Sequence, residues 1–207
     1  MKHIKIVAVL TIMASGVYAQ ADTLWTRTYG GSDFDKGYSV QQTQDGGFII
    51  VGFTESYGAG GEDVYLIKTD ENGDTLWTRT YGGSSDDMGN SVQETTDGGF
   101  IIAGYTYSYG AGGSGVYLIR TDSLGDTLWT RTYGGSDDDY GYSVQQCQDG
   151  GFIIAGKTES YGAGYYDVYL IRTDSMGDTL WTKTYGGSDD DEGYSVQQCQ
   201  DGGFIIA

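Results

Sequence analysis

A string of ten residues, DTLWTRTYGG, recurs at a fixed spacing and constrains the fold more than any other feature of the chain. Its copies begin at Asp22, Asp74, Asp126 and Asp178, so the repeat is 52 residues long, and only the last copy differs, with Lys183 in place of arginine. A regular repeat of this kind indicates stacked, equivalent units, because one unit alone cannot bury its apolar surface.

One unit, taken from Tyr38, contains four segments in which β-branched and aromatic residues are dense and between which glycine-rich turns lie. These segments are 38–44, 48–54, 63–69 and 75–82. The second, FIIVGFT, is apolar on both faces, as a strand buried between two layers must be. The fourth alternates, with Leu76 on one face and Trp77 on the other. The unit is therefore predicted to be an antiparallel meander.

Stacking decides the predicted fold class. Radial stacking of four-stranded units gives an all-β fold, a β-propeller of four-stranded antiparallel blades. A β-helix is the competing arrangement, but its coils usually need far fewer than 52 residues. We therefore predict a propeller in which each repeated tryptophan lies on an outermost strand and packs at the seam with the next blade.

The positions of the repeat copies divide the chain into a predicted outer strand, three complete blades and one partial blade. We expect a propeller domain over 20–207, with an outer strand at 22–31, blades at 38–82, 90–134 and 142–186, and a partial blade at 194–207. The final copy stops in the middle of a predicted strand, which would leave backbone groups unpaired. We expect an incomplete propeller of about three and a half blades, a fragment of a longer gene product.

The first 19 residues have the features of a secretory signal peptide. Lys2, His3 and Lys5 form a positive region, residues 6–17 are apolar, and Ala19 supplies the small residue at the cleavage position. A buried N-terminal strand is the alternative. We expect residues 1–19 to be removed and the mature protein to be secreted, or periplasmic or on the cell surface of a bacterium, without membrane insertion.

The charge balance excludes several classes of partner and chemistry. The chain carries 29 acidic and 11 basic residues, a formal net charge of −18, which becomes −20 once Lys2 and Lys5 are removed. Such a chain repels nucleic acid and anionic lipid. His3 is the single histidine and lies in the signal peptide, so catalytic triads lack their usual base and zinc its commonest ligand.

The two cysteines occupy equivalent positions in successive units, Cys147 and Cys199. Neighbouring sheets lie about 10 Å apart, whereas a disulfide needs Cα atoms closer than about 7 Å. The spacing favours two free thiols over a disulfide.

The repeat motifs resemble those of a known group of proteins. DGGFIIAG, SYGAGG, DVYLIRTD and GDTLWTRTYGGSDDD are similar to motifs of repetitive secreted bacterial β-propeller proteins, in broad terms the β-propeller-repeat and quinoprotein-dehydrogenase-like sets. The resemblance covers the chain after Gln20 and implies a propeller fold and an extracellular location. Longer members often end in a sorting domain for secretion across the outer membrane.

The loops are where we expect a ligand, since function usually lies in loops on a rigid scaffold. The loop between the second and third strands and the loop between blades are predicted to share one face. A protein or glycan partner is expected on that face, at Tyr57, Tyr109, Tyr161, Tyr165 and Tyr166.

The acidic clusters of the same face have two interpretations. A run of aspartates is commonly a solvated loop that keeps a protein soluble, which is the interpretation we favour. Carboxylates also suit calcium, and the candidate ligands would be Asp137, Asp138, Asp139, Asp189, Asp190 and Asp191. We expect no cofactor, with calcium as the alternative.

Three functions remain open at the level of sequence. The leading prediction is a secreted, non-catalytic binding or structural module that presents tyrosine, glycine and aspartate-rich loops on one face. The alternative is an extracellular polysaccharide-active hydrolase, or its propeller domain, using Asp and Glu with calcium; Glu55 and Glu159 match each other across units. A quinone-dependent dehydrogenase would need a tryptophan at the axis, whereas these tryptophans are predicted on the outermost strands.

Overall fold

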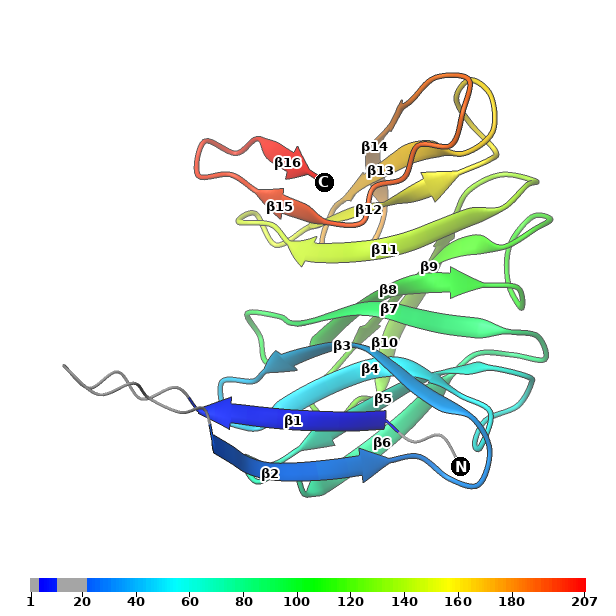
Figure 1. The fold of residues 1–207 in the computed structure, drawn as a ribbon. Coiled ribbons are helices and arrows are strands. Elements are labelled where there is room, and N and C mark those ends of the chain that lie inside the picture. The colour runs from blue at the N-terminus through cyan, green and yellow to red at the C-terminus, as the bar shows by residue number, and fades with distance from the viewer. Residues whose placement is uncertain (1–3, 11–21) are drawn as a thin grey trace.

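The computed structural model describes residues 4–10 and 22–207, which form β-strands and loops (Figure 1). Three four-stranded antiparallel sheets follow one another along the chain. Their strands are β3 (Asp35–Gln42), β4 (Phe48–Thr54), β5 (Asp63–Thr69) and β6 (Thr75–Tyr81); β7 (Asp87–Glu94), β8 (Phe100–Thr106), β9 (Gly115–Thr121) and β10 (Thr127–Tyr133); and β11 (Asp139–Gln146), β12 (Phe152–Thr158), β13 (Asp167–Thr173) and β14 (Thr179–Tyr185).

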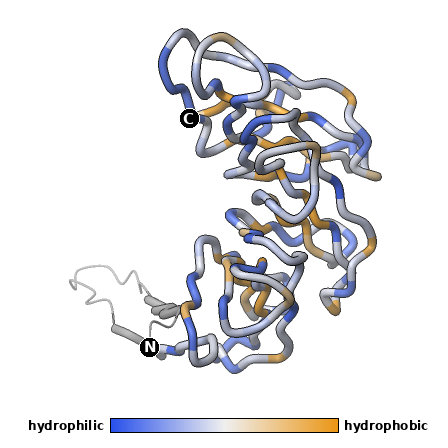
Figure 2. Tube along the Cα trace, turned by 90° about the vertical axis from the view of Figure 1, so that its right-hand side faces the viewer, coloured by the Kyte–Doolittle hydropathy of each residue, from blue (hydrophilic) through white to orange (hydrophobic). Residues whose placement is uncertain are grey.

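Each sheet is a meander, in which neighbours in the sequence are neighbours in the sheet. Two-stranded sheets flank the three, formed by β1 (Ile4–Leu10) with β2 (Asp22–Tyr29) and by β15 (Val196–Gln198) with β16 (Phe204–Ile206). The sheets stack along a curved path, with the innermost strands β3, β7 and β11 on the inside of the curve (Figures 1 and 2). No described residue belongs to a helix able to span a membrane. The predicted all-β fold of repeated four-stranded antiparallel units is confirmed.

The bounds of the innermost strand correct the sequence prediction. The first strand of the unit was expected at 38–44 but extends from Asp35 to Gln42. Asp35 pairs with Thr54 across the sheet, and the register shifts between Gly37 and Ser39. A β-bulge therefore interrupts the period-two pattern at this point, so the alternation of side chains does not mark where the strand begins.

The core lies between sheets, because the two middle strands of each sheet are buried on both faces. Every residue of β5 and of β9 is buried. Ile49 and Leu66 of the first sheet join Phe100 and Ile119 of the second in one apolar cluster. The opposite face of the second sheet packs in the same way on the third. Apolar faces are thus removed from water only by stacking one copy on the next.

The outermost strands seal the seams between sheets, as predicted for the tryptophans. Trp77 on β6 packs edge to face on Phe100 of the next sheet at a centroid distance of 5.9 Å, and Tyr81 donates a hydrogen bond of 2.7 Å to the carbonyl of Gly125. Leu76 points away and is 58% exposed. The other seams repeat the aromatic contact, with the pairs Trp25–Phe48, Trp129–Phe152 and Trp181–Phe204.

Glutamine side chains link the innermost strands on the inner side of the same seams. The side-chain oxygen of Gln93 on β7 accepts the backbone N–H of Gln146 on β11 at 2.6 Å. The equivalent bond from Glu94 to Gln41 joins β7 to β3 at 2.7 Å. These bonds give backbone N–H groups at the free edges of β7 and β11 a partner and link the innermost strands to one another.

The N-terminal segment forms a strand in the structure. Residues 4–10, part of the predicted signal peptide, form β1 and pair antiparallel with β2. The β-branched residues of this segment suit a strand. The predicted cleavage position at Ala19 lies outside the described residues, so the signal peptide stays a prediction.

Both cysteines are free, as predicted. Cys147 is buried and Cys199 is half-buried. Burial raises the pKa of the Cys147 thiol above its ordinary value, which keeps that thiol protonated and poorly reactive.

Candidate functional site

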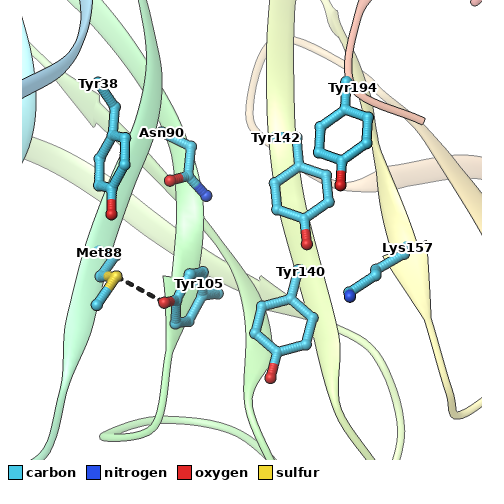
Figure 3. A pocket seen from close by; sticks show the side chains of 8 residues that line it. All are labelled: Tyr38, Met88, Asn90, Tyr105, Tyr140, Tyr142, Lys157 and Tyr194. Atoms are coloured by element: carbon cyan, nitrogen blue, oxygen red, sulfur yellow. Dashed lines mark hydrogen bonds between the residues drawn. The ribbon is translucent and has the colours of Figure 1, made fainter. Parts of the chain in front are cut away.

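A cavity of about 420 Å³ opens on the innermost strands (Figure 3). We call it the tyrosine pocket, and it is lined by Tyr38, Met88, Asn90, Tyr105, Tyr140, Tyr142, Lys157 and Tyr194. Its size is within the range of small-molecule sites, and aromatic walls with a few polar groups are typical of such sites.

β-Bulges place three of these side chains in the pocket. In each sheet the register of the innermost strand shifts at one residue, which has no direct partner on the neighbouring strand. That residue is Tyr38 in β3, Asn90 in β7 and Tyr142 in β11. A bulge bends the strand and changes the direction of its side chain. Residues of three sheets therefore reach one cavity.

Glycine allows the strands to approach closely below the pocket. A Cβ on Gly104 of β8 would lie 1.7 Å from the carbonyl oxygen of Met88. No other residue fits this position without moving β7 away from β8. The rigid pairing of these strands sets the position of Met88 and Tyr105, which face each other across the pair.

The tyrosine rings contact one another. Tyr105 and Tyr140 meet edge to face at 4.7 Å, and Tyr142 stacks on Tyr194 at 4.9 Å with an interplanar angle of 17°. Burial raises the pKa of Tyr105, Tyr140 and Tyr142 above the ordinary value. Their hydroxyls are therefore protonated at neutral pH and act as hydrogen-bond donors.

One of these hydroxyls has a weak partner. Tyr105 donates to the sulfur of Met88 at 2.6 Å, the single hydrogen bond among the residues drawn in Figure 3. A thioether is a poor acceptor. A ligand oxygen in the pocket would be a better acceptor for the same hydroxyl.

Lys157 and Glu192 form the charged part of the site. Nζ of Lys157 lies 2.6 Å from Oε1 of Glu192 and 3.9 Å from the centroid of the Tyr166 ring. The hydroxyl of Tyr194 donates to the other carboxylate oxygen. Desolvation acts to raise the pKa of Glu192, but the hydrogen bonds from Lys157 and Tyr194 outweigh it and lower that pKa. The pair is therefore ionised and neutral overall.

Among the strands, sequence divergence between the repeats is concentrated around this pocket. One equivalent position is Lys36, Met88, Tyr140 and Glu192 in the four copies, and it differs in all of them. The residue paired with it across the sheet also differs in every complete copy, being Phe53, Tyr105 and Lys157. The strand residues between these positions are nearly constant. Because equivalent backbone positions carry a different side chain in every copy, packing alone does not fix the residue.

The five loop tyrosines predicted from the sequence to contact a ligand lie in different environments in the structure. Tyr109 and Tyr161 donate to the carbonyls of Gly82 and Gly134 at 2.7 and 2.9 Å, so their hydroxyls hold one loop to the next. Tyr57 packs on Tyr65 at 5.7 Å in the same way that its copies pack on the third strand. Tyr165 is 68% exposed. Tyr166 alone of the five adjoins the pocket, through Lys157.

The aspartate clusters divide into exposed and buried residues, which corrects the interpretation of the whole run as solvated. Asp137 is exposed, and Asp138 accepts the backbone N–H of Ser114 at 2.7 Å. Asp139 is fully buried and accepts bonds from Gly135 N–H and the Ser160 hydroxyl. A short polar side chain at the start of β11 thus fixes both adjoining loops.

The last cluster follows the same order of exposure. Asp189 and Asp190 are exposed, and Asp191 is half-buried and accepts the Gly187 N–H at 2.9 Å. Across the described ranges no three carboxylates, thiols or imidazoles are grouped to hold a metal ion. The calcium hypothesis therefore has no support from side-chain grouping in this part of the chain.

The carboxylates of the hydrolase alternative are far apart in the fold. Glu55 and Glu159 are exposed directly after β4 and β12, in different sheets. The tryptophans lie on outermost strands and not on the inside of the curve.

No family model matches the chain. The chain is 25% identical over 181 residues to the regulatory protein FlaEY of Caulobacter vibrioides, an alignment covering 74% of this chain. The chain spans only 19% of that relative's length. A crystal structure of a protein of unknown function from Bacteroides caccae is similar, with a TM-score of 0.55 and 11% identity, over 90% of this chain and 57% of that one. At this identity the likeness concerns the fold.

Proposed function

We propose that this protein is a binding module built as a β-propeller, and that it holds a glycan in the tyrosine pocket. The observation that carries the proposal is the cavity itself, in which side chains from three sheets converge on one space while the strands of the copies are otherwise nearly identical. A site formed on strands is held more rigidly than one formed on loops.

The chemistry of the lining favours a glycan over an apolar ligand. Sugar rings present apolar C–H faces together with many hydroxyls, which are both donors and acceptors. Stacked rings such as Tyr142 and Tyr194 offer flat apolar surfaces with a polar edge. Asn90 and the protonated tyrosine hydroxyls supply directional polar contacts around them.

The test measures binding of uncharged hexasaccharides of glucose, mannose and xylose by calorimetry, with the protein and two variants. Tyr142→Ala removes a wall of the pocket and is expected to weaken binding about fivefold or more, since stacked aromatic contacts are worth about 1 kcal/mol or more. Tyr165→Ala is the matched control, because Tyr165 is an exposed loop tyrosine that does not line the pocket.

The control also distinguishes the pocket from the loop face predicted from the sequence. Unchanged binding in Tyr165→Ala with loss in Tyr142→Ala supports the pocket. The reverse pattern would move the site to the loop face. Binding of none of the sugars by the unmodified protein would refute the glycan proposal.

The propeller and the secreted location are parts of the proposal with tests of their own. The repeated seams, each closed by a tryptophan and a tyrosine, support sheets arranged about a common axis. A crystal structure in which the sheets stack without turning about an axis would contradict the propeller. Expression in a bacterium with the native N-terminus should give an exported protein whose first residue is Gln20, and mass spectrometry of the cell fractions checks this.

A further inference from the structure

The ion pair at the edge of the tyrosine pocket carries an inference about which glycans the site accepts. Lys157 comes from β12 of the third sheet, and Glu192 comes from the fourth copy of the repeat. We infer that the pocket takes uncharged glycans and rejects acidic ones, and that Glu192 determines this specificity. The inference rests on the proposed function.

An unpaired lysine here would favour an acidic sugar. A lone ammonium group among aromatic rings is poorly solvated, and a carboxylate of a uronic acid would be its natural partner. Glu192 already occupies that place at 2.6 Å, and the two side chains are only 15% and 22% exposed. Nζ also lies over the faces of Tyr166 and Tyr140. The positive charge of Lys157 is therefore already balanced within the protein.

The carboxylate of Glu192 is equally occupied. One oxygen accepts from Lys157 and the other from the hydroxyl of Tyr194. A ligand carboxylate that bound Lys157 would either displace Glu192, leaving a partly buried negative charge without its partner, or place two carboxylates beside one ammonium group. Replacing the carboxylate of Glu192 with that of a ligand gains no additional attraction to Lys157. It also deprives Glu192 of the group that stabilises its charge.

The surroundings of the pocket add repulsion. The chain carries a formal net charge of −18. Burial first, and then the neighbouring Tyr38 and the carboxylate of Glu62, raise the pKa of Tyr105, a residue of the pocket. The net negative charge of the protein repels an approaching acidic glycan, whereas it does not repel an uncharged glycan.

The experiment compares hexasaccharides of glucose, mannose and xylose with hexasaccharides of glucuronic, galacturonic and mannuronic acid. Calorimetry is done with the unmodified protein and with Glu192→Gln, which keeps the shape of the side chain and one acceptor oxygen but removes the negative charge that neutralises Lys157. We expect the unmodified protein to bind an uncharged sugar at least tenfold more tightly than any acidic one. We expect Glu192→Gln to bind an acidic sugar about tenfold more tightly than the unmodified protein does.

Two further variants make the result specific. Glu71→Gln removes one negative charge from an exposed turn of the first sheet and should leave the preference unchanged. Glu192→Gln combined with Lys157→Met should lose the gained affinity for acidic sugars, because the gain depends on the free ammonium group.

The outcomes separate this inference from the proposed function. No binding of any sugar refutes the glycan site itself. Binding of acidic sugars by the unmodified protein as tightly as uncharged ones overturns the inference and leaves the glycan site standing. The inference is also overturned if a folded Glu192→Gln variant gains no affinity for acidic sugars. If that variant does not fold, the affinities of the unmodified protein for uncharged and acidic sugars decide whether the inference holds.

Discussion

Replacing Trp129 with alanine tests whether the seams between sheets hold the fold together. Trp129 is partly buried, with its ring edge to face against Phe152 at 6.0 Å, and the guanidinium of Arg131 lies 5.5 Å from its centre. The far edge of the ring rests on Gly177, whose position leaves no room for a Cβ. The substitution removes contacts between the second and third sheets from the outermost strand β10 and leaves the buried middle strands unchanged.

The expected cost follows from that partial burial. Truncating a fully buried tryptophan costs about 3–5 kcal/mol. Since part of this ring already faces solvent, we expect about 2–3 kcal/mol, of which the aromatic pair with Phe152 accounts for about 1 kcal/mol. For a chain of this size that corresponds to a fall in melting temperature of about 5–10 °C.

Circular dichroism during urea and thermal unfolding measures the effect. Leu128→Ala is the matched control, since Leu128 precedes the tryptophan on β10, points away from the seam and is 58% exposed; its cost should be below about 0.5 kcal/mol. If the two substitutions destabilise the protein equally, the tryptophan does not stabilise the seam and the stacking of sheets described above is wrong.

The remaining predictions concern the turns, one ion pair and the acidic loops. Gly177→Ala should lower the free energy of unfolding by about 2 kcal/mol or more, because Gly177 has φ +79° and a Cβ would lie 2.9 Å from the Trp129 ring. At Gly150, which has φ +86° and open space around it, alanine should cost only about 1 kcal/mol. Urea unfolding of both variants checks this difference. The hydrogen bond from Lys68, with others, lowers the pKa of Asp45 to about 2 from its ordinary 3.8, so the pair's contribution to stability is present above pH 4 and is lost as the pH falls through 2. An NMR titration of that carboxyl in Lys68→Met should show the pKa returning toward 3.8, and an unchanged pKa would disprove the assignment. Calcium, magnesium and sodium chlorides at equal ionic strength should raise the melting temperature equally, since exposed aspartates such as Asp137 are only screened; a calcium-specific rise that Asp137→Asn abolishes would reveal a cation site.

The repeat in the sequence was sufficient to determine the number of strands per unit, their antiparallel order and the location of the core. Each of these follows from local properties, namely apolar periodicity, turn glycines and the need of one unit for a neighbour. The alternation of Leu76 and Trp77 predicted which face of β6 would meet the next sheet, and the structure confirms it. The free thiols followed equally from spacing alone.

The candidate site depended on features that local sequence does not encode. The bulge at Tyr142 turns its side chain toward the inside of the curve, and its position depends on pairing with β12. The sequence pattern predicted a site on the loops, where the hydroxyls of Tyr109 and Tyr161 hold one loop to another. The divergence of the strand positions between copies was a signal in the sequence, but its meaning required knowing which residues face the same cavity.

The charges of the site show the same division between sequence and tertiary structure. Composition determined the acidity of the whole chain, which is a sum over residues and needs no fold. The pairing of Lys157 with Glu192 joins residues from two repeats, and the burial of Asp139 depends on the loops around it. Only tertiary structure determines such contacts, because the electrostatic role of a side chain depends on which groups lie within a few ångströms of it and on how much water reaches them.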